Sequence, residues 1–198
     1  MRSLNGRYDA AVAAIDAANA ADPNHVQVRG RSAPLALVHG QLAAEWVEQL
    51  VDDPDEAVLI AARAHHLRRW EVPRDSYPAG RTGYLRWRRD QKARHAADVG
   101  QILTACGYDG AEIERVQQLV RRESVEGAQA VEDAACLVFI ETQLASVAAR
   151  LAHGLLMDVI RKTARKMSPA GLRLVESIPL AVSERALLAS ALGDSPST

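Results

Sequence analysis

The chain contains 198 residues, of which 48% are apolar and only 4% are aromatic. This length is enough for one domain with a buried core, and a core of Ala, Leu, Val and Ile is typical of a helical bundle. Two cysteines exclude a disulfide framework and favour a reducing cytoplasm, and the lack of a long apolar segment argues against a signal peptide or a membrane span. We therefore expect a cytoplasmic, all-α single domain over residues 1–193, with about seven to eight helices and a frayed tail over residues 194–198.

The hydrophobic pattern has the 3.6-residue period of a helix, and no segment shows the two-residue period of a strand. The string Asp53-Pro54-Asp55-Glu56 is interpreted as an N-cap, a proline at the first helical position and a capping-box acid. The segment Glu71–Gly80 contains two prolines and is predicted to be a loop. The predicted helices cover about Arg7–Ala20, Ser32–Val51, Asp53–Trp70, Thr82–Cys106, Asp109–Glu123, Gln129–Leu151 and Leu155–Met167, then a short turn opened by Ser168-Pro169 and a last helix capped by Ser183.

The most unusual stretch is Ala61–Arg88, which holds a His pair, two Trp, two Tyr and many Arg. From Arg63 to Arg94 there are ten basic and three acidic residues, in a chain whose net charge is −1. Such a basic block favours an anionic partner, whether phosphate, a nucleotide or a polynucleotide. The alternative is a solvated helix face whose arginine stems cover apolar surface.

Polar residues fall on the inward-facing stripes of four predicted helices, namely His39, His65, His95 and Asp133. His66 lies about 100° around its helix from His65. An unpaired buried carboxylate is costly, whereas imidazoles and a carboxylate brought together are what a divalent metal ion requires. The alternative is structural: each histidine would bond to a backbone carbonyl, and Asp133 would pair with an arginine of the basic block.

Arginines and aromatic residues follow the His pair. The prolines of the predicted loop would hold Arg74 and Arg81 in fixed positions, where a guanidinium can bind phosphate or carboxylate through two hydrogen bonds. The aromatic rings either stack on a base or sugar or, as we favour, seal the loop onto a core that lacks bulk. The predicted anion-binding residues are Arg69, Arg74, Arg81, Tyr77, Tyr84 and Trp87.

The order of His39, the pair His65-His66 after AARA, and Asp133 in VEDAACLVFIE resembles the HD superfamily of metal-dependent phosphohydrolases. The resemblance covers about Leu35 to Glu141 and implies an HD-like helical fold. It also implies a divalent metal ion (Mn, Fe, Zn, Ni or Co), held by His39, His65, His66 and Asp133.

The helix with His95 is similar to an additional His-containing helix of that superfamily, which makes His95 and His66 the predicted catalytic residues. The chain departs from the superfamily at the doublet, where His66 stands in place of Asp. It departs again at Arg121-Arg122, where a second downstream His would fall. These departures weaken the case for a second metal ion and for full hydrolase chemistry.

Nearly the whole chain resembles the DUF4202 family of uncharacterised proteins, through HHLRRWEVPRDSYPAGRTGYLRWR and VEDAACLVFIE. The family brings no established activity. Its signature includes His66, Trp70, Pro73, Arg74, Tyr77, Arg81, Tyr84, Trp87, His95, Glu132 and Asp133, whereas His39 and His65 are less typical of it.

These observations favour an HD-like, metal-dependent phosphohydrolase acting on a small phosphorylated or nucleotide-like anion. The competing hypothesis is a metal-free module that binds a nucleotide or RNA, with a His/Asp cluster that is a structural hydrogen-bond network. An HD-type iron oxygenase is the third and least favoured. No membrane partner is expected, and a homo-oligomer remains open.

Overall fold

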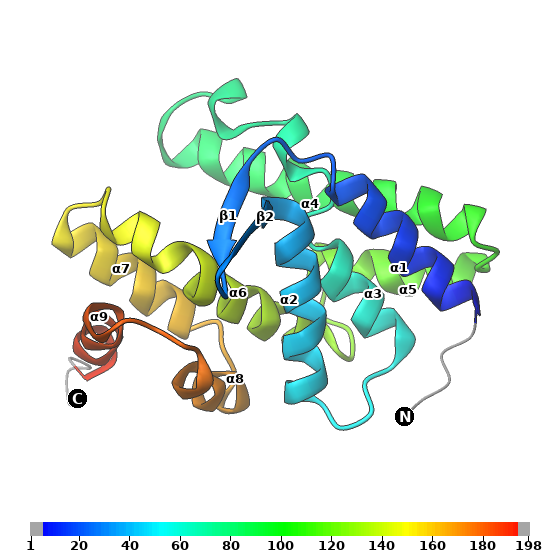
Figure 1. Ribbon diagram of the computed structural model, residues 1–198. Helices are drawn as coiled ribbons and strands as arrows, with labels where there is room; N and C mark the ends of the chain where they lie inside the picture. Colours follow the sequence, from blue (N-terminus) through cyan, green and yellow to red (C-terminus); the bar gives the residue numbers. More distant parts are fainter. Residues whose placement is uncertain (1–5, 194–198) are drawn as a thin grey trace.

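The computed structural model describes residues 6–193 and shows an all-α protein with one short antiparallel hairpin (Figure 1). The predicted fold class is thereby confirmed, while the predicted tail over residues 194–198 lies outside the described residues. The elements are α1 (Gly6–Asn19), β1 (His25–Val28), β2 (Arg31–Pro34), α2 (Leu35–Leu50), α3 (Glu56–Ala64), α4 (Gly80–Ala105), α5 (Gly110–Arg121), α6 (Ala128–Ala148), α7 (His153–Ala164), α8 (Pro169–Leu174) and α9 (Val182–Gly193), with 3₁₀ turns at Arg69–Glu71, Arg74–Ser76 and Val175–Ser177.

Helix α3 lies at the centre of the bundle. It packs against α1, α2, α5 and α6, and every residue from Val58 to Ala62 is buried. A helix that is apolar on all sides is suited to such enclosure. The surrounding core is aliphatic, with Leu119 and Leu137 fully buried. Because α3 ends inside the protein, the residues that follow it, His65 and His66, are delivered into the interior.

The longer helices enclose α3 in pairs. Helix α4 packs along α5, and α2 packs along α6. Helices α7 and α9 contact each other and lie, in Figure 1, on the opposite side of the molecule from α1 and α5. The connection between α3 and α4 projects at the top of the same view.

The start of α3 differs from the predicted one. Its N-cap is Asp55, whose carboxylate accepts a hydrogen bond from the Val58 N–H at 2.8 Å, and the first helical residue is Glu56. Asp53 instead adopts a left-handed conformation with φ of 54°. The predicted cap at Asp53 is therefore wrong, because Pro54 precedes the cap rather than opening the helix.

The end of α3 also differs. The predicted helix continued to Trp70, but the α-helix stops at Ala64. The chain then turns back at Arg68, whose φ of 51° is incompatible with a continuing right-handed helix, and Trp70 lies in the 3₁₀ turn Arg69–Glu71. The basic residues that follow the His pair are therefore not on a continuation of the same helix.

Helix starts set by side-chain caps are confirmed at two places. Asp109 and Glu112 form the predicted capping box at α5, and the Ser168 hydroxyl accepts the Gly171 N–H at α8, with Pro169 in the first turn. Two other predicted caps are wrong. Helix α4 begins at Gly80 behind Ala79, so Thr82 lies within its first turn, and α9 begins at Val182, so Ser183 lies inside it.

The hairpin of β1 and β2 was not predicted. Its register pairs His25 with Pro34 and Val28 with Arg31 across a two-residue turn. Each strand has four residues. The side chains of β1 alternate between exposed and half-buried, whereas in β2 the first two are exposed and the last two are half-buried. So short and weak an alternation leaves no clear two-residue period in the sequence.

Candidate functional site

A cavity of about 290 Å³ opens beyond the end of α3, between α4, α6 and α7. Its wall includes His65 and His66 from the α3 terminus and His95 from α4. Arg122, directly after α5, and Glu132 of α6 complete the charged part of the wall. Five segments that are distant in the sequence therefore converge on this space.

The cavity is strongly cationic. Among the described lining residues, Glu132 is the one carboxylate. It accepts a hydrogen bond from Arg122 Nε at 3.1 Å and lies 3.7 Å from the Lys166 ammonium. The cations that line the cavity are Arg69, Arg88, Lys92, Arg122 and Lys166.

Burial lowers the pKa of three of these cations. Desolvation lowers the pKa of Arg69 to about 10, and desolvation followed by the charge of Arg122 lowers the pKa of Lys92. Burial likewise lowers the pKa of Arg122, against the opposing effect of Glu132. Five cations facing one carboxylate in partly dry surroundings create a positive potential that an anion would relieve.

His65 caps α3 and is buried, with 5% of its surface exposed. Its Nδ1 lies 2.7 Å from the Ala62 carbonyl oxygen, which can only accept a hydrogen bond. The Nδ1 atom therefore carries the proton, and Nε2 of the neutral ring carries a lone pair. That Nε2 is buried and has no hydrogen-bond partner among the described residues.

A hydrogen-bonded chain assigns the proton of His66. The Thr142 hydroxyl donates to the Val138 carbonyl at 2.6 Å, so it must accept from His39 Nε2 at 3.0 Å. With Nε2 protonated, Nδ1 of neutral His39 accepts from His66 Nδ1 at 2.9 Å. The remaining nitrogen of His66, Nε2, therefore carries a lone pair, and His66 lines the cavity.

His95 is the third imidazole of the cavity wall, with its ring centroid 6.3 Å from that of His66. It is 2% exposed, and neither ring nitrogen has a hydrogen-bond partner among the described residues. The Leu67 carbonyl lies near enough to oppose the fall in its pKa without completing a hydrogen bond of normal geometry. His95 is thus a buried polar side chain with unused hydrogen-bonding capacity.

Burial keeps the whole cluster neutral at physiological pH. Desolvation, with the charge of Arg69 second, lowers the pKa of His39 and of His95 to about 3. Desolvation also lowers the pKa of His65 and of His66 well below the ordinary value. Four uncharged imidazoles consequently lie beside five cations.

The structure does not bring Asp133 to the histidines. Its carboxylate accepts hydrogen bonds from the Ser168 N–H at 2.8 Å, the Ser168 hydroxyl at 2.5 Å and Gln129 Nε2 at 2.9 Å. Asp133 therefore fastens the start of α8 and is absent from the described lining of the cavity. Its burial was correctly predicted, but the expected partners, a metal ion or an arginine, are not the ones it meets.

The residue set predicted for a metal ion is accordingly not assembled. His39, His65 and His66 lie together, but Asp133 is directed elsewhere, and His39 uses both ring nitrogens within the hydrogen-bonded chain. Over residues 6–193, no group of three or more His, Cys, Asp or Glu side chains is placed to hold a metal ion. The described residues thus do not fit the HD-type metal shell.

In the proline-containing loop, residues 71–80, Arg74 has a structural role. The Arg74 guanidinium donates to the carbonyls of Tyr77, Pro78 and Gly80, at 3.0, 2.9 and 3.2 Å. Arg81 is exposed. The structure thus places neither arginine in the described cavity wall.

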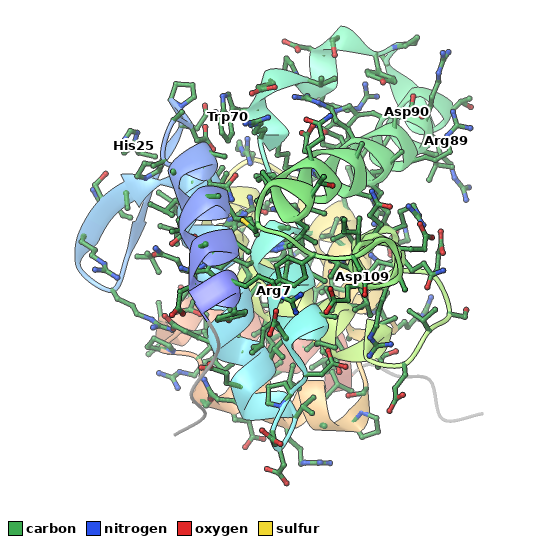
Figure 2. The ribbon with its side chains drawn as sticks, turned by 90° about the vertical axis from the view of Figure 1, so that its right-hand side faces the viewer. Arg7, His25, Trp70, Arg89, Asp90 and Asp109 are labelled. Atoms are coloured by element: carbon green, nitrogen blue, oxygen red, sulfur yellow. The ribbon has the colours of Figure 1, made fainter. Side chains whose placement is uncertain are left out.

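Some of the predicted aromatic residues lie near the cavity and others on the proline-containing loop. The Trp87 indole is buried, donates to the Val72 carbonyl at 2.9 Å and lies under the Arg69 guanidinium, 4.4 Å from the ring centroid. Tyr77 donates to Asp90 on the outer side of α4, which is labelled in Figure 2. Of the predicted anion-binding residues, Arg69 and Tyr84 line the cavity.

Four cations of the cavity were missed by the sequence analysis. Two of them, Arg88 and Lys92, could have been predicted from the sequence. They lie at helical spacing from His95 on the same face of α4. Extending the inward stripe of His95 towards the start of the helix would have found them. Arg122 and Lys166 carried no comparable signal, since both follow the ends of helices.

The fold and the site define an all-α protein with a basic, histidine-floored cavity. The family model described as "Domain of unknown function (DUF4202)" matches residues 9–188, and the chain belongs to this family. No curated protein and no solved structure matches the chain. Within the described residues, no helix is both long and apolar enough to cross a membrane.

Proposed function

We propose that this protein hydrolyses a small phosphorylated or nucleotide-like compound, which binds in the basic cavity. The observation that carries the proposal is that, among the described residues, five cations and a single carboxylate line a cavity whose innermost wall consists of neutral imidazoles. Cations in a partly desolvated cavity bind phosphate groups and stabilise the charge that develops on them during reaction. The sequence resemblance to HD phosphohydrolases favours the same class of reaction, although the described residues do not assemble the metal shell of that superfamily.

In this proposal Arg69, Lys92 and Arg122 neutralise the phosphoryl group. His66 Nε2 takes the proton of the water that attacks phosphorus, while the P–O bond to the leaving group breaks and its electron pair goes to the leaving oxygen. The low pKa of His66 makes it a weak base in the free protein. A bound phosphate dianion raises that pKa, because an opposite charge favours the imidazolium.

No step of this proposal passes through a metal ion, because Asp133 is held by Ser168. His95, the other predicted catalytic residue, lies close enough to His66 to contact the same ligand.

The binding half of the proposal is tested with inorganic phosphate and two single-charge variants of α4. Lys92→Ala removes a cation of the cavity wall, whereas Arg86→Ala removes a side chain that is 67% exposed and pairs with Asp90. Loss of a charged hydrogen-bond partner costs about 1.5–3 kcal/mol, so Lys92→Ala should weaken phosphate binding roughly 10- to 100-fold in calorimetry. Equal effects of the two variants would contradict the proposed site.

The hydrolytic half is tested by phosphate release from a panel of sugar phosphates, nucleotides and p-nitrophenyl phosphate. His66→Asn should abolish turnover and retain phosphate binding, since the cations remain. Turnover at the unchanged rate in His66→Asn would remove His66 from the mechanism. Binding without turnover of any compound by the unchanged protein would leave the second candidate.

That second candidate is a nucleotide- or RNA-binding module without turnover. Exposed arginines on the outer side of α4 favour it, among them Arg86 and Arg89, the latter labelled in Figure 2. Polynucleotide affinity should fall steeply with salt, and Arg89→Ala should weaken it while leaving inorganic phosphate binding unchanged.

A further inference from the structure

The histidines His65, His66 and His95 form the innermost wall of the cavity, which is called its floor. This floor contains polar atoms that have no hydrogen-bond partner among the described residues. His65 and His95 are 5% and 2% exposed, yet Nε2 of His65 and both ring nitrogens of His95 lack a hydrogen bond. Buried polar groups in folded proteins are almost always hydrogen-bonded, because neither protein nor water otherwise replaces the lost solvation. Two such side chains in one wall offer a ligand hydrogen-bonding positions that the described residues do not use.

The tautomers determine which kind of ligand group is required. His65 Nε2 carries a lone pair, since the Nδ1 proton of that ring is used by the Ala62 carbonyl. The lone pair on His66 Nε2 is the one that the proposed function assigns to the attacking water. A lone pair is satisfied by a hydrogen-bond donor, such as a hydroxyl or an amine, and not by a phosphate oxygen. The floor of the cavity therefore favours the part of a ligand that carries donors.

Three of the five cations lie towards the opening, whereas Arg69 and Arg122 are more deeply buried. The Lys166 side chain is 43% exposed and Arg88 and Lys92 are half-buried, in contrast to the buried imidazoles. Arg88, Lys92, Arg122, Glu132 and Lys166 also line an adjoining open groove beside the start of α6, so the basic wall continues outwards. An anionic group is thus best placed among the cations, and a donor-rich group against His65 and His95.

We propose that the ligand is a phosphate ester of a small polyol or amino sugar, which enters with its hydroxyl or amine end first. The inference rests on the proposed function and adds the class of compound to it. A cavity of about 290 Å³ corresponds to roughly ten water volumes, which suits a sugar phosphate. Inorganic phosphate and polyphosphates carry no hydroxyl or amine on carbon, so their only donors are the P–OH groups of the protonated anions.

The test compares probes that share the phosphate and differ in donors. Methyl phosphate has no hydroxyl group on carbon, whereas glycerol 3-phosphate, ribose 5-phosphate and glucosamine 6-phosphate have several donors. In calorimetry with the unchanged protein, at least one of these three should bind 10-fold or more tightly than methyl phosphate. This comparison needs no variant, so the inference can be overturned even if every variant fails to fold.

The variant His95→Leu adds a sharper readout, because it removes no hydrogen bond of the described residues. It should bind the donor-bearing probe at least 10-fold more weakly and methyl phosphate with unchanged affinity. His65→Leu serves as the second variant with the same expected split. Circular dichroism and thermal melting show that each variant is folded.

The outcomes separate this inference from the proposed function. If methyl phosphate binds and no donor-bearing probe binds more tightly, the inference is overturned and the phosphate site stands. If His95→Leu and His65→Leu, both folded, weaken all probes equally, the histidines act structurally and the inference is again overturned. If neither inorganic phosphate nor any probe binds, the proposed function itself fails.

Discussion

Lowering the pH from 7.5 to 5.5 should strongly destabilise the fold, because the unfolded chain takes up four histidine protons that the buried cluster of the folded protein does not bind. His39, His65 and His95 are almost fully buried, and His66 is enclosed by the other three rings. Burial and neighbouring cations lower the pKa of each of them. In the unfolded chain the histidines are exposed to water, so their pKa is not lowered in this way.

The sign and size of this change in the free energy of unfolding follow from the difference in histidine pKa between the folded and unfolded states. An unfolded histidine has a pKa of about 6.5, so below that value the unfolded chain binds more protons than the native protein. The cluster's contribution is therefore complete above pH 6.5 and is lost as the pH falls towards about 3, the native pKa of His39 and His95. At pH 5.5 each histidine costs about 1.4 kcal/mol, and the four together cost roughly 5–6 kcal/mol.

A loss of that size is comparable with the whole stability of an ordinary domain, about 5–15 kcal/mol. Urea unfolding followed by circular dichroism at pH 7.5, 6.5 and 5.5 measures it. His95→Leu should reduce the loss by about 1.4 kcal/mol, whereas the matched control His153→Gln, at an exposed position, should not. A change below about 2 kcal/mol between pH 7.5 and 5.5 would refute the assignment of four neutral buried imidazoles.

Three further substitutions test individual contacts. Asp133→Ala should lower the free energy of unfolding by about 2–4 kcal/mol in urea titrations, since it removes three hydrogen bonds, and should leave phosphate binding unchanged; weaker phosphate binding at unchanged stability would contradict the structural role. Arg74→Ala should speed amide hydrogen exchange over residues 71–80, because three carbonyls lose their donor, and should not alter phosphate affinity. Gly83→Ala would place Cβ 1.9 Å from the Pro78 carbonyl oxygen and should lower the melting temperature, whereas Gly110→Ala, with nothing within 4 Å of its Cβ, is the matched control and should not.

Features of the fold that depend on a few neighbouring residues could be predicted from the sequence. The capping box of Asp109 and Glu112 and the cap at Ser168 were found because the partners lie within three residues of each other. The helical period and the inward position of His39 were equally local signals. The end of α3 was not, since nothing in the sequence marks the left-handed turn at Arg68.

The candidate site was predicted in part, for a physical reason. The stripe positions showed which histidines are buried, but not what each buried group meets across the helix interface. Asp133 illustrates the limit: its partner Ser168 is 35 residues away and belongs to a short helix whose placement follows from packing. The cations Arg122 and Lys166 likewise reach the cavity only because α5, α6 and α7 converge there.

At Arg122 the backbone conformation favours glycine, whereas the side chain forms hydrogen bonds on the wall of the cavity. It follows the last residue of α5 with φ of 62°, a conformation in which glycine is the preferred residue. Its guanidinium meanwhile donates to the Leu119 and Val120 carbonyls and to Glu132, on the wall of the cavity. A designer who improved the helix end with Arg122→Gly would relax the backbone and delete a positive charge from the site in the same step. The substitution would also remove three hydrogen bonds, so the backbone conformation and the side-chain bonds favour different residues at this position.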